Sequence, residues 1–143
     1  DHIYQILSRI SELKLSVIPI LDEKENYIGC TTVQHLMSLI ANTGSIKENG
    51  GILVLEMAHC DYSMAQIGQI VESNDAKILS SYIMSSPDST SIEVTLKINK
   101  IELDPIIRTF ERYDYIIKAS FQKSVYQEDL NYRYDALMNY LNL

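Results

Sequence analysis

Residues 51–72 read GILVLEMAHCDYSMAQIGQIVE and place a strand, a loop and a helix in direct succession. The first eight residues are almost all apolar, a length and composition typical of a buried strand. Ser63 is placed to cap the helix, and Gln66 follows three residues later, which is capping-box spacing. Apolar side chains then recur at helical spacing, namely Met64, Ile67, Ile70 and Val71. The segment predicts one strand–helix unit of an α+β domain.

A second unit of the same kind follows. Residues 76–86 predict a strand, and SIEVTLKIN at 91–99 alternates between apolar and polar side chains, as a half-buried antiparallel strand does. Asp104 and Pro105 open a helix with proline at its first position, and residues 115–122 predict the last strand. The order βαββαβ predicts a ferredoxin-like arrangement, a four-stranded sheet with two helices on one face and its other face open.

Glu56 is the one carboxylate on a mostly apolar strand. We expect it on the open sheet face, directed towards Lys118 on the last strand, as a cross-strand pair.

Residues 1–43 predict a smaller helix–strand–strand–helix unit, with a helix over roughly 2–14, strands at 17–20 and 27–30, and the turn DEKEN between them. Thr31 stands three residues before Gln34, so we expect it to cap a second helix that buries Val33, Leu36, Met37 and Ile40. Residues 44–50 are polar, contain glycine and lack periodicity, which is typical of a linker. We expect residues 51–123 to form the second domain. We expect residues 124–143 to form a helical tail, and its four tyrosines suit an interface.

Composition restricts the function. The net charge is −7, from 12 basic and 19 acidic residues, and no basic cluster offers a footprint for nucleic acid. No apolar run reaches the roughly 20 residues of a membrane span. Cys30 and Cys60 lie on separate units, which favours reduced thiols and a cytoplasmic location. We therefore expect a cytoplasmic protein without nucleic-acid or membrane partners.

The stretch LSVIPILDEKENYIGCTTVQHLM resembles one CBS motif, because Pro19, Asp22, Gly29 and Thr32 fall on positions of that family. The strand that leads a complete motif is absent before Asp1, and CBS motifs work in pairs, so the resemblance implies a partner motif upstream. Residues 51–122 are similar to an ACT domain, through the βαββαβ order and through Asp61, Ile67, Ile70 and Ile78. The order CBS then ACT resembles small bacterial proteins of the acetoin-utilisation regulator type.

These resemblances imply ligand sensing by a homodimer, with a small-molecule effector shifting its oligomer or domain arrangement. A CBS cleft implies an adenine nucleotide such as AMP or ATP, and an ACT interface implies an amino acid. The implied nucleotide-binding residues are Val17, Ile18, Pro19, Thr31, Thr32 and His35. The implied amino-acid-binding residues are Asp61, Tyr62, Ser63, Met64 and Ala65.

Both implied sites depart from their family. His35 stands where CBS nucleotide binders carry an aspartate that grips the ribose hydroxyls. Met64 and Ala65 stand where ACT domains carry a glycine that lets a ligand approach the backbone. The alternative is therefore an oligomerisation or interaction module whose ligand sites are degenerate.

The sequence favours neither a metal site nor an enzyme. His59, Cys60 and Asp61 are the only local cluster of metal-type ligands, but consecutive side chains diverge and structural zinc uses four spaced ligands. Ser63 lies near His59 in sequence, yet a nucleophile needs a base that a third group orients. We expect no catalytic residues, no metal and no resident cofactor. A thiol or metal sensor built on Cys60 and His59 is a third hypothesis.

Overall fold

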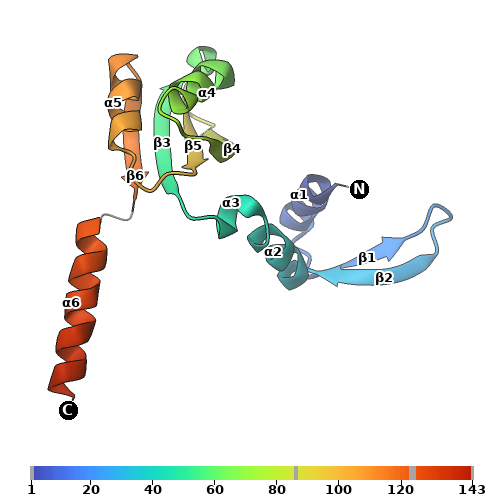
Figure 1. The fold of residues 1–143 in the computed structure, drawn as a ribbon. Helices are drawn as coiled ribbons and strands as arrows, with labels where there is room; N and C mark the ends of the chain where they lie inside the picture. The colour runs from blue at the N-terminus through green and yellow to red at the C-terminus, as the bar shows by residue number, and fades with distance from the viewer. Residues whose placement is uncertain (1, 86, 123–124, 143) are drawn as a thin grey trace. The chain divides into compact units, whose positions relative to one another are not determined.

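The computed structural model describes residues 2–85, 87–122 and 125–142, and it does not describe the side chains of 125–131. The chain divides into two compact units, Asp1–Lys47 and Glu48–Leu143 (Figure 1). Each unit combines helices with an antiparallel sheet, which confirms the predicted α+β class.

The second unit is built on a four-stranded sheet in the order β4-β5-β3-β6. Every pair of neighbouring strands is antiparallel. The elements are β3 (Gly51–Ala58), the 3-10 turn η1 (His59–Asp61), α4 (Met64–Glu72), β4 (Ile78–Ser85), β5 (Ser91–Ile98), α5 (Asp104–Arg112) and β6 (Ile116–Phe121). The order of strands and longer helices is the βαββαβ predicted above.

One face of this sheet carries the core, together with α4 and α5. Alternate residues of β3 and β5 are buried, as the period of two predicts. They pack with the apolar stripes of both helices around Phe110, which is fully buried. The predicted stripe of α4 holds, since Ile67, Ile70 and Val71 are buried and Met64 packs at the margin of the core.

The opposite face of the sheet is not covered by either helix, and we call it the open face. Strand register places these residues on it: Ile52, Val54, Glu56 and Ala58 of β3; Ser80, Tyr82 and Met84 of β4; Ser91, Glu93, Thr95 and Lys97 of β5; Ile116, Ala119 and Phe121 of β6. A bulge in β6 leaves Lys118 as the extra residue between the partners of Val54 and Leu55.

Local capping explains where the two long helices begin. The Ser63 hydroxyl accepts the Gln66 backbone N–H at 3.3 Å and caps α4, as predicted. Helix α5 begins at Asp104, so Pro105 occupies its second position rather than its first. The N-cap residue Leu103 makes no side-chain cap bond, and Gln122, which directly follows β6, bonds to the start of α5 instead. The Gln122 Oε1 accepts the Leu103 N–H at 2.7 Å, and its Nε2 donates to Asp104 at 3.0 Å.

The first unit contains a two-stranded sheet and three helices. They are α1 (Ile3–Leu13), β1 (Val17–Leu21), β2 (Tyr27–Thr32), α2 (Val33–Ala41) and α3 (Gly44–Lys47). The short α3 lies inside the segment that the sequence predicted to be a linker. The predicted cap of α2 is wrong by one residue, because it is the Thr32 hydroxyl that accepts the His35 N–H, at 3.1 Å.

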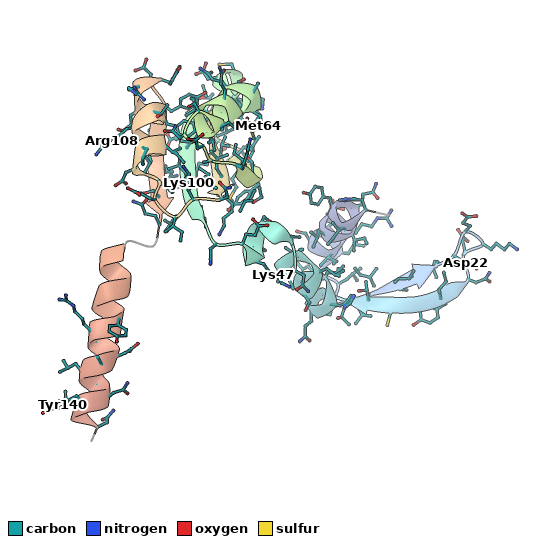
Figure 2. All side chains as sticks on the ribbon, in the orientation of Figure 1. Asp22, Lys47, Met64, Lys100, Arg108 and Tyr140 are labelled. Carbon is teal, nitrogen blue, oxygen red and sulfur yellow. The ribbon has the colours of Figure 1, made fainter. Side chains whose placement is uncertain are left out.

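The turn between β1 and β2 is organised by Asp22, at the tip of the hairpin in Figure 2. Its Oδ1 accepts the backbone N–H groups of Lys24 at 2.8 Å and Asn26 at 2.9 Å. Glu25 adopts a left-handed φ of 62° within this turn. The aspartate that resembles a CBS family position therefore has a structural role here.

The first unit has almost no buried side chains. Leu36 is the one residue that is buried among those the structure describes in this unit, and Met37, expected in the core, is 58% exposed. Large apolar side chains on α1, β1 and β2 are exposed as well, including Leu13, Val17 and Ile28. Much of the apolar surface of this unit is therefore exposed among the residues that the structure describes.

The tail forms α6 (Val125–Leu141), as predicted. Its tyrosines Tyr132, Tyr134 and Tyr140 are exposed, whereas the side chain of Tyr126 lies outside the described residues. None of the helices described has the length and apolar character needed to cross a bilayer.

Candidate functional site

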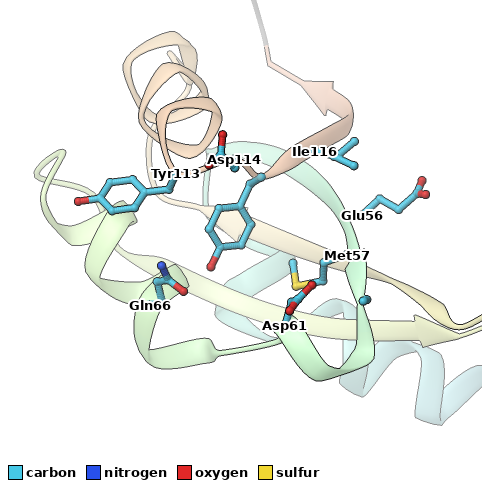
Figure 3. A pocket seen from close by; sticks show the side chains of 9 residues that line it. Glu56, Met57, Asp61, Gln66, Tyr113, Asp114 and Ile116 are labelled. Carbon is cyan, nitrogen blue, oxygen red and sulfur yellow. The ribbon is translucent and has the colours of Figure 1, made fainter.

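A hollow of about 380 Å³ opens in the second unit where β3 runs into η1 and where α5 leads into β6 (Figure 3). In Figure 3, Asp61 and Met57 lie on one side of it and Tyr113 and Asp114 on the other. Its lining residues are Glu56, Met57, Ala58, Asp61, Gln66, Tyr113, Asp114, Tyr115 and Ile116. The hollow thus draws its residues from two segments that are distant in sequence.

Backbone turns position both sides of this hollow. Strand β3 ends at Ala58, and the single turn of η1 brings Asp61 in front of the first turn of α4. On the other side, Asp114 has a left-handed φ of 62°, which reverses the chain after α5. The Tyr115 N–H then donates to the Phe110 carbonyl at 3.0 Å, and this bond holds Tyr115 at the start of β6.

Tyr115 is the distinctive residue of the site. Its ring packs edge-on against Phe110, with centroids 5.2 Å apart and planes at 78°. Its hydroxyl oxygen is shielded from solvent and has no hydrogen-bond partner among the residues that the structure describes. Burial raises the pKa of Tyr115 above its ordinary value, and the negative charge of Asp61 raises it further. A shielded hydroxyl without a partner costs free energy, so this group has an unused capacity for hydrogen bonding beside the hollow.

The lining of the hollow is acidic. Glu56, Asp61 and Asp114 contribute carboxylates, and none of the nine lining residues is basic. Gln66 and Tyr115 add neutral groups that donate and accept hydrogen bonds. This arrangement favours a small cationic ligand, since an ammonium group bonds to several oxygens at once.

Only one predicted amino-acid-binding residue lines this hollow, and that residue is Asp61. Tyr62 and Met64 pack at the margin of the core, Ser63 caps α4, and Ala65 is exposed on the first turn of that helix. The sequence prediction missed Tyr113, Asp114 and Tyr115. The βαββαβ order was a usable signal, because it places the segment before the last strand beside the end of the first.

The predicted nucleotide-binding residues lie together in the first unit. Val17 pairs with Thr32 and Ile18 with Thr31 at the end of the two-stranded ladder. Pro19 follows, paired with Cys30, and the Thr32–His35 bond described above joins the start of α2 to this end of the sheet. The His35 side chain is exposed. The Thr31 hydroxyl is shielded without a partner, whereas that of Thr32 is used as the helix cap.

Cys30 and Cys60 are both free and exposed. The Cys60 thiol contacts Asp61, with 3.8 Å between Sγ and Oδ1. Within the described residues, no three histidine, cysteine or acidic side chains gather as a metal site would require. His59, Cys60 and Asp61 therefore do not converge on one point.

The ion pair on the open face is not the predicted one, which joined Glu56 to Lys118. The Lys118 ammonium forms its ion pair with Glu93 on β5, and not with Glu56 on the neighbouring strand. The hydrogen bond to Glu93 raises the pKa of Lys118, with smaller contributions from the charges of Glu93 and Glu56. Lys118 therefore reaches across β3 and lies in the field of both glutamates.

The chain matches no protein-family model, and no curated protein matches it significantly. The resemblances to CBS and ACT sequences therefore remain predictions, and the site has to be interpreted from its own geometry.

Proposed function

We propose that this chain is a regulatory protein that senses a small molecule, with an amino acid as the ligand of the hollow beside Asp61. The observation that carries this proposal is the shielded Tyr115 hydroxyl without a partner, in a hollow lined by three carboxylates. The resemblance of the second unit to ACT domains supports an amino acid over other amines. An adenine nucleotide at the CBS-like unit is the second ligand that the resemblances imply.

The ligand's ammonium group would bond to the carboxylate of Asp61, in a hollow whose lining also contains Glu56 and Asp114. Three acidic side chains around one hollow repel each other, and a bound cation relieves that repulsion. The same charges disfavour a dianionic ligand such as a nucleotide in this hollow. We therefore assign a nucleotide, if one binds, to the first unit.

The carboxylate of an amino acid needs donors, and two are at hand. The first turn of α4 presents backbone N–H groups at the positive end of the helix dipole. Tyr115 adds a hydroxyl that could donate a hydrogen bond to a ligand carboxylate that comes within bonding distance of it. An amino acid would thus bridge Asp61 and the start of α4.

Ligand binding would be communicated through the sheet. Glu56 and Ile116 line the hollow, and both also belong to the open face. A ligand that reorients Glu56 changes the charges on that face, and so biases whatever packs against it. The proposed mechanism is regulatory and involves no catalysed reaction.

The test is the thermal midpoint of the full chain against a panel of amino acids and adenine nucleotides. A ligand at about a hundred times its dissociation constant adds about 2.7 kcal/mol, or several degrees for a small domain. The shift with an amino acid should disappear in Asp61→Asn and persist in Asp75→Asn, a conservative change at a left-handed turn position just beyond the C-terminal end of α4. A shift that survives Asp61→Asn would exclude this hollow.

A second candidate is an interaction module that binds no small molecule. The exposed apolar side chains of the first unit favour it, because such a surface suits a macromolecular partner. The two candidates differ in the same assay: a sensor gains stability with its ligand, and a pure interaction module gains none with any member of the panel.

A further inference from the structure

The open face of the second unit is an apolar surface with charges at two levels. Its outer strands carry side chains that are largely exposed: Tyr82 is 57% exposed, Met84 61%, Ile116 62% and Phe121 62%. Val54 and Thr95 occupy the middle of the two central strands and are direct cross-strand partners. A face of this composition is typical of a protein interface.

The charges of this face lie at two separate positions along the strand direction. A level here means the set of residues that face each other across neighbouring strands. Glu93 and Glu56 are cross-strand partners on one side of the Thr95 level. Lys97 lies two residues beyond Thr95 on the other side, and it forms no ion pair with any side chain that the structure describes. Lys118 pairs with Glu93, so Glu56, Glu93 and Lys118 together leave one net negative charge at the first level, and Lys97 gives one positive charge to the second.

We propose that the open face packs against the open face of a second copy, around a two-fold axis that runs across the strands at the level of Thr95. Such an axis exchanges the two levels, so that the net negative level of one copy, which holds Glu93 and Glu56, faces Lys97 of the other, twice. An axis along the strands would instead bring Glu93 towards Glu56 of the second copy, which is repulsive. The charge pattern thus selects one of the two face-to-face arrangements.

The apolar residues fit the same axis. On β6, Ile116 is level with Glu56 and Phe121 is level with Ile52, on opposite sides of the axis. The rotation brings Ile116 of one copy over Phe121 of the other, while Val54 and Thr95 face their own counterparts. Face-to-face sheets pack with their strands within about 30° of alignment, which this arrangement allows. The packing requires no ligand and stands independently of the proposed sensing function.

The test combines charge reversal with cross-linking in the full chain. Lys97→Glu should weaken the dimer at least about tenfold in sedimentation equilibrium, because it turns two attractions into two repulsions. The double variant Lys97→Glu with Glu93→Lys should recover most of that loss. Arg108→Glu and Glu111→Lys, on helix α5 away from the open face, are the matched controls and should leave the dissociation constant unchanged.

Cross-linking distinguishes this face from dimerisation through the first unit. In a background with Cys30→Ser and Cys60→Ser, Thr95→Cys should give a covalent dimer with a short bis-maleimide, whereas Glu111→Cys should not. The proposal is overturned if Thr95→Cys stays monomeric, as it would with α6 or another protein on this face. It is also overturned if the double charge reversal dissociates as readily as Lys97→Glu alone.

Discussion

Glu56 on β3 and Glu93 on β5 lie directly opposite each other, so the two central strands of the open face carry a pair of cross-strand carboxylates. Like charges in this relationship destabilise an antiparallel pair of strands. Lys118 offsets the repulsion from a third strand, and it does so because the β6 bulge makes it the extra residue beside β3. The bulge in β6 therefore supplies the positive charge that compensates the two glutamates.

Replacing Lys118 with glutamine should lower the thermal midpoint, because it leaves the two glutamates facing each other. The loss should be largest at low ionic strength and shrink as salt screens the charges. Lys77→Gln is the control, since it removes a more exposed pair with Glu72 that is 3.2 Å long. Equal midpoints for the two variants at low salt would contradict the role given to Lys118.

The pH dependence of the Lys118 pair has a defined sign. The bond to Glu93 raises the pKa of Lys118 above its ordinary value of 10.5. A raised pKa means that the pair stabilises the fold fully below pH 10.5, and that this contribution is lost as the pH rises through the raised value. Alkaline unfolding of the wild type and of Lys118→Gln should therefore converge, whereas their midpoints differ near neutrality.

Tyr115→Phe should separate stability from binding. Removing a shielded hydroxyl that has no partner should stabilise the free protein by roughly 1 kcal/mol, measured by denaturant unfolding. The same variant should bind the amino-acid ligand more weakly, because the ligand loses one hydrogen bond. If Tyr115→Phe instead destabilises the free protein, the hydroxyl has a structural partner and is not held for a ligand.

Thr109 joins the two helices of the second unit. Its hydroxyl donates to the Pro105 carbonyl at 2.8 Å and accepts from the Asn74 amide at 3.2 Å, just beyond the end of α4. Thr109→Val keeps the shape but leaves Asn74 without this acceptor, so it should cost about 1–3 kcal/mol of unfolding free energy. Thr109→Ser retains the hydroxyl and should cost clearly less than valine does.

Acid should destabilise the hairpin of the first unit only at a pH below the ordinary pKa of an aspartate. The Asn26 backbone N–H, then its side-chain amide, lower the pKa of Asp22 below its ordinary value of 3.8. The carboxylate therefore stabilises the turn above pH 3.8, and this contribution is lost as the pH falls through the lowered value. An NMR titration of the Asp22 carboxyl carbon checks the direction, and a midpoint at or above 3.8 would refute it.

Periodicity was sufficient to predict most of the second unit. The alternation of Ile92, Val94, Leu96 and Ile98 identified both β5 and its buried face, because successive side chains of a strand point to opposite faces of the sheet. The helical stripe of α4 was predicted for the same reason. Such patterns depend on local geometry, but burial also needs a packing partner: the same periodicity predicted a buried Met37 on α2, and that side chain is 58% exposed.

Features that depend on register or on long-range contacts were not predictable in this way. The cap of α2 fell on Thr32 instead of Thr31, because a hydroxyl at either position satisfies the local pattern. The partner of Lys118 depends on a bulge that no local signal marks. Tyr115 approaches Asp61 only once the sheet has formed, so the central residue of the site was outside the reach of local patterns.

The central claim is that the hollow beside Asp61 and Tyr115 recognises an amino group. The most direct measurement is calorimetric titration of the full chain with an amino acid that shifts the midpoint, compared with its analogue in which hydrogen replaces the amino group. A hydrogen bond between charged groups contributes about 1.5–3 kcal/mol, so the analogue should bind at least about tenfold more weakly. Equal affinities for the two compounds would contradict the account, as would the absence of binding by every amino acid tested.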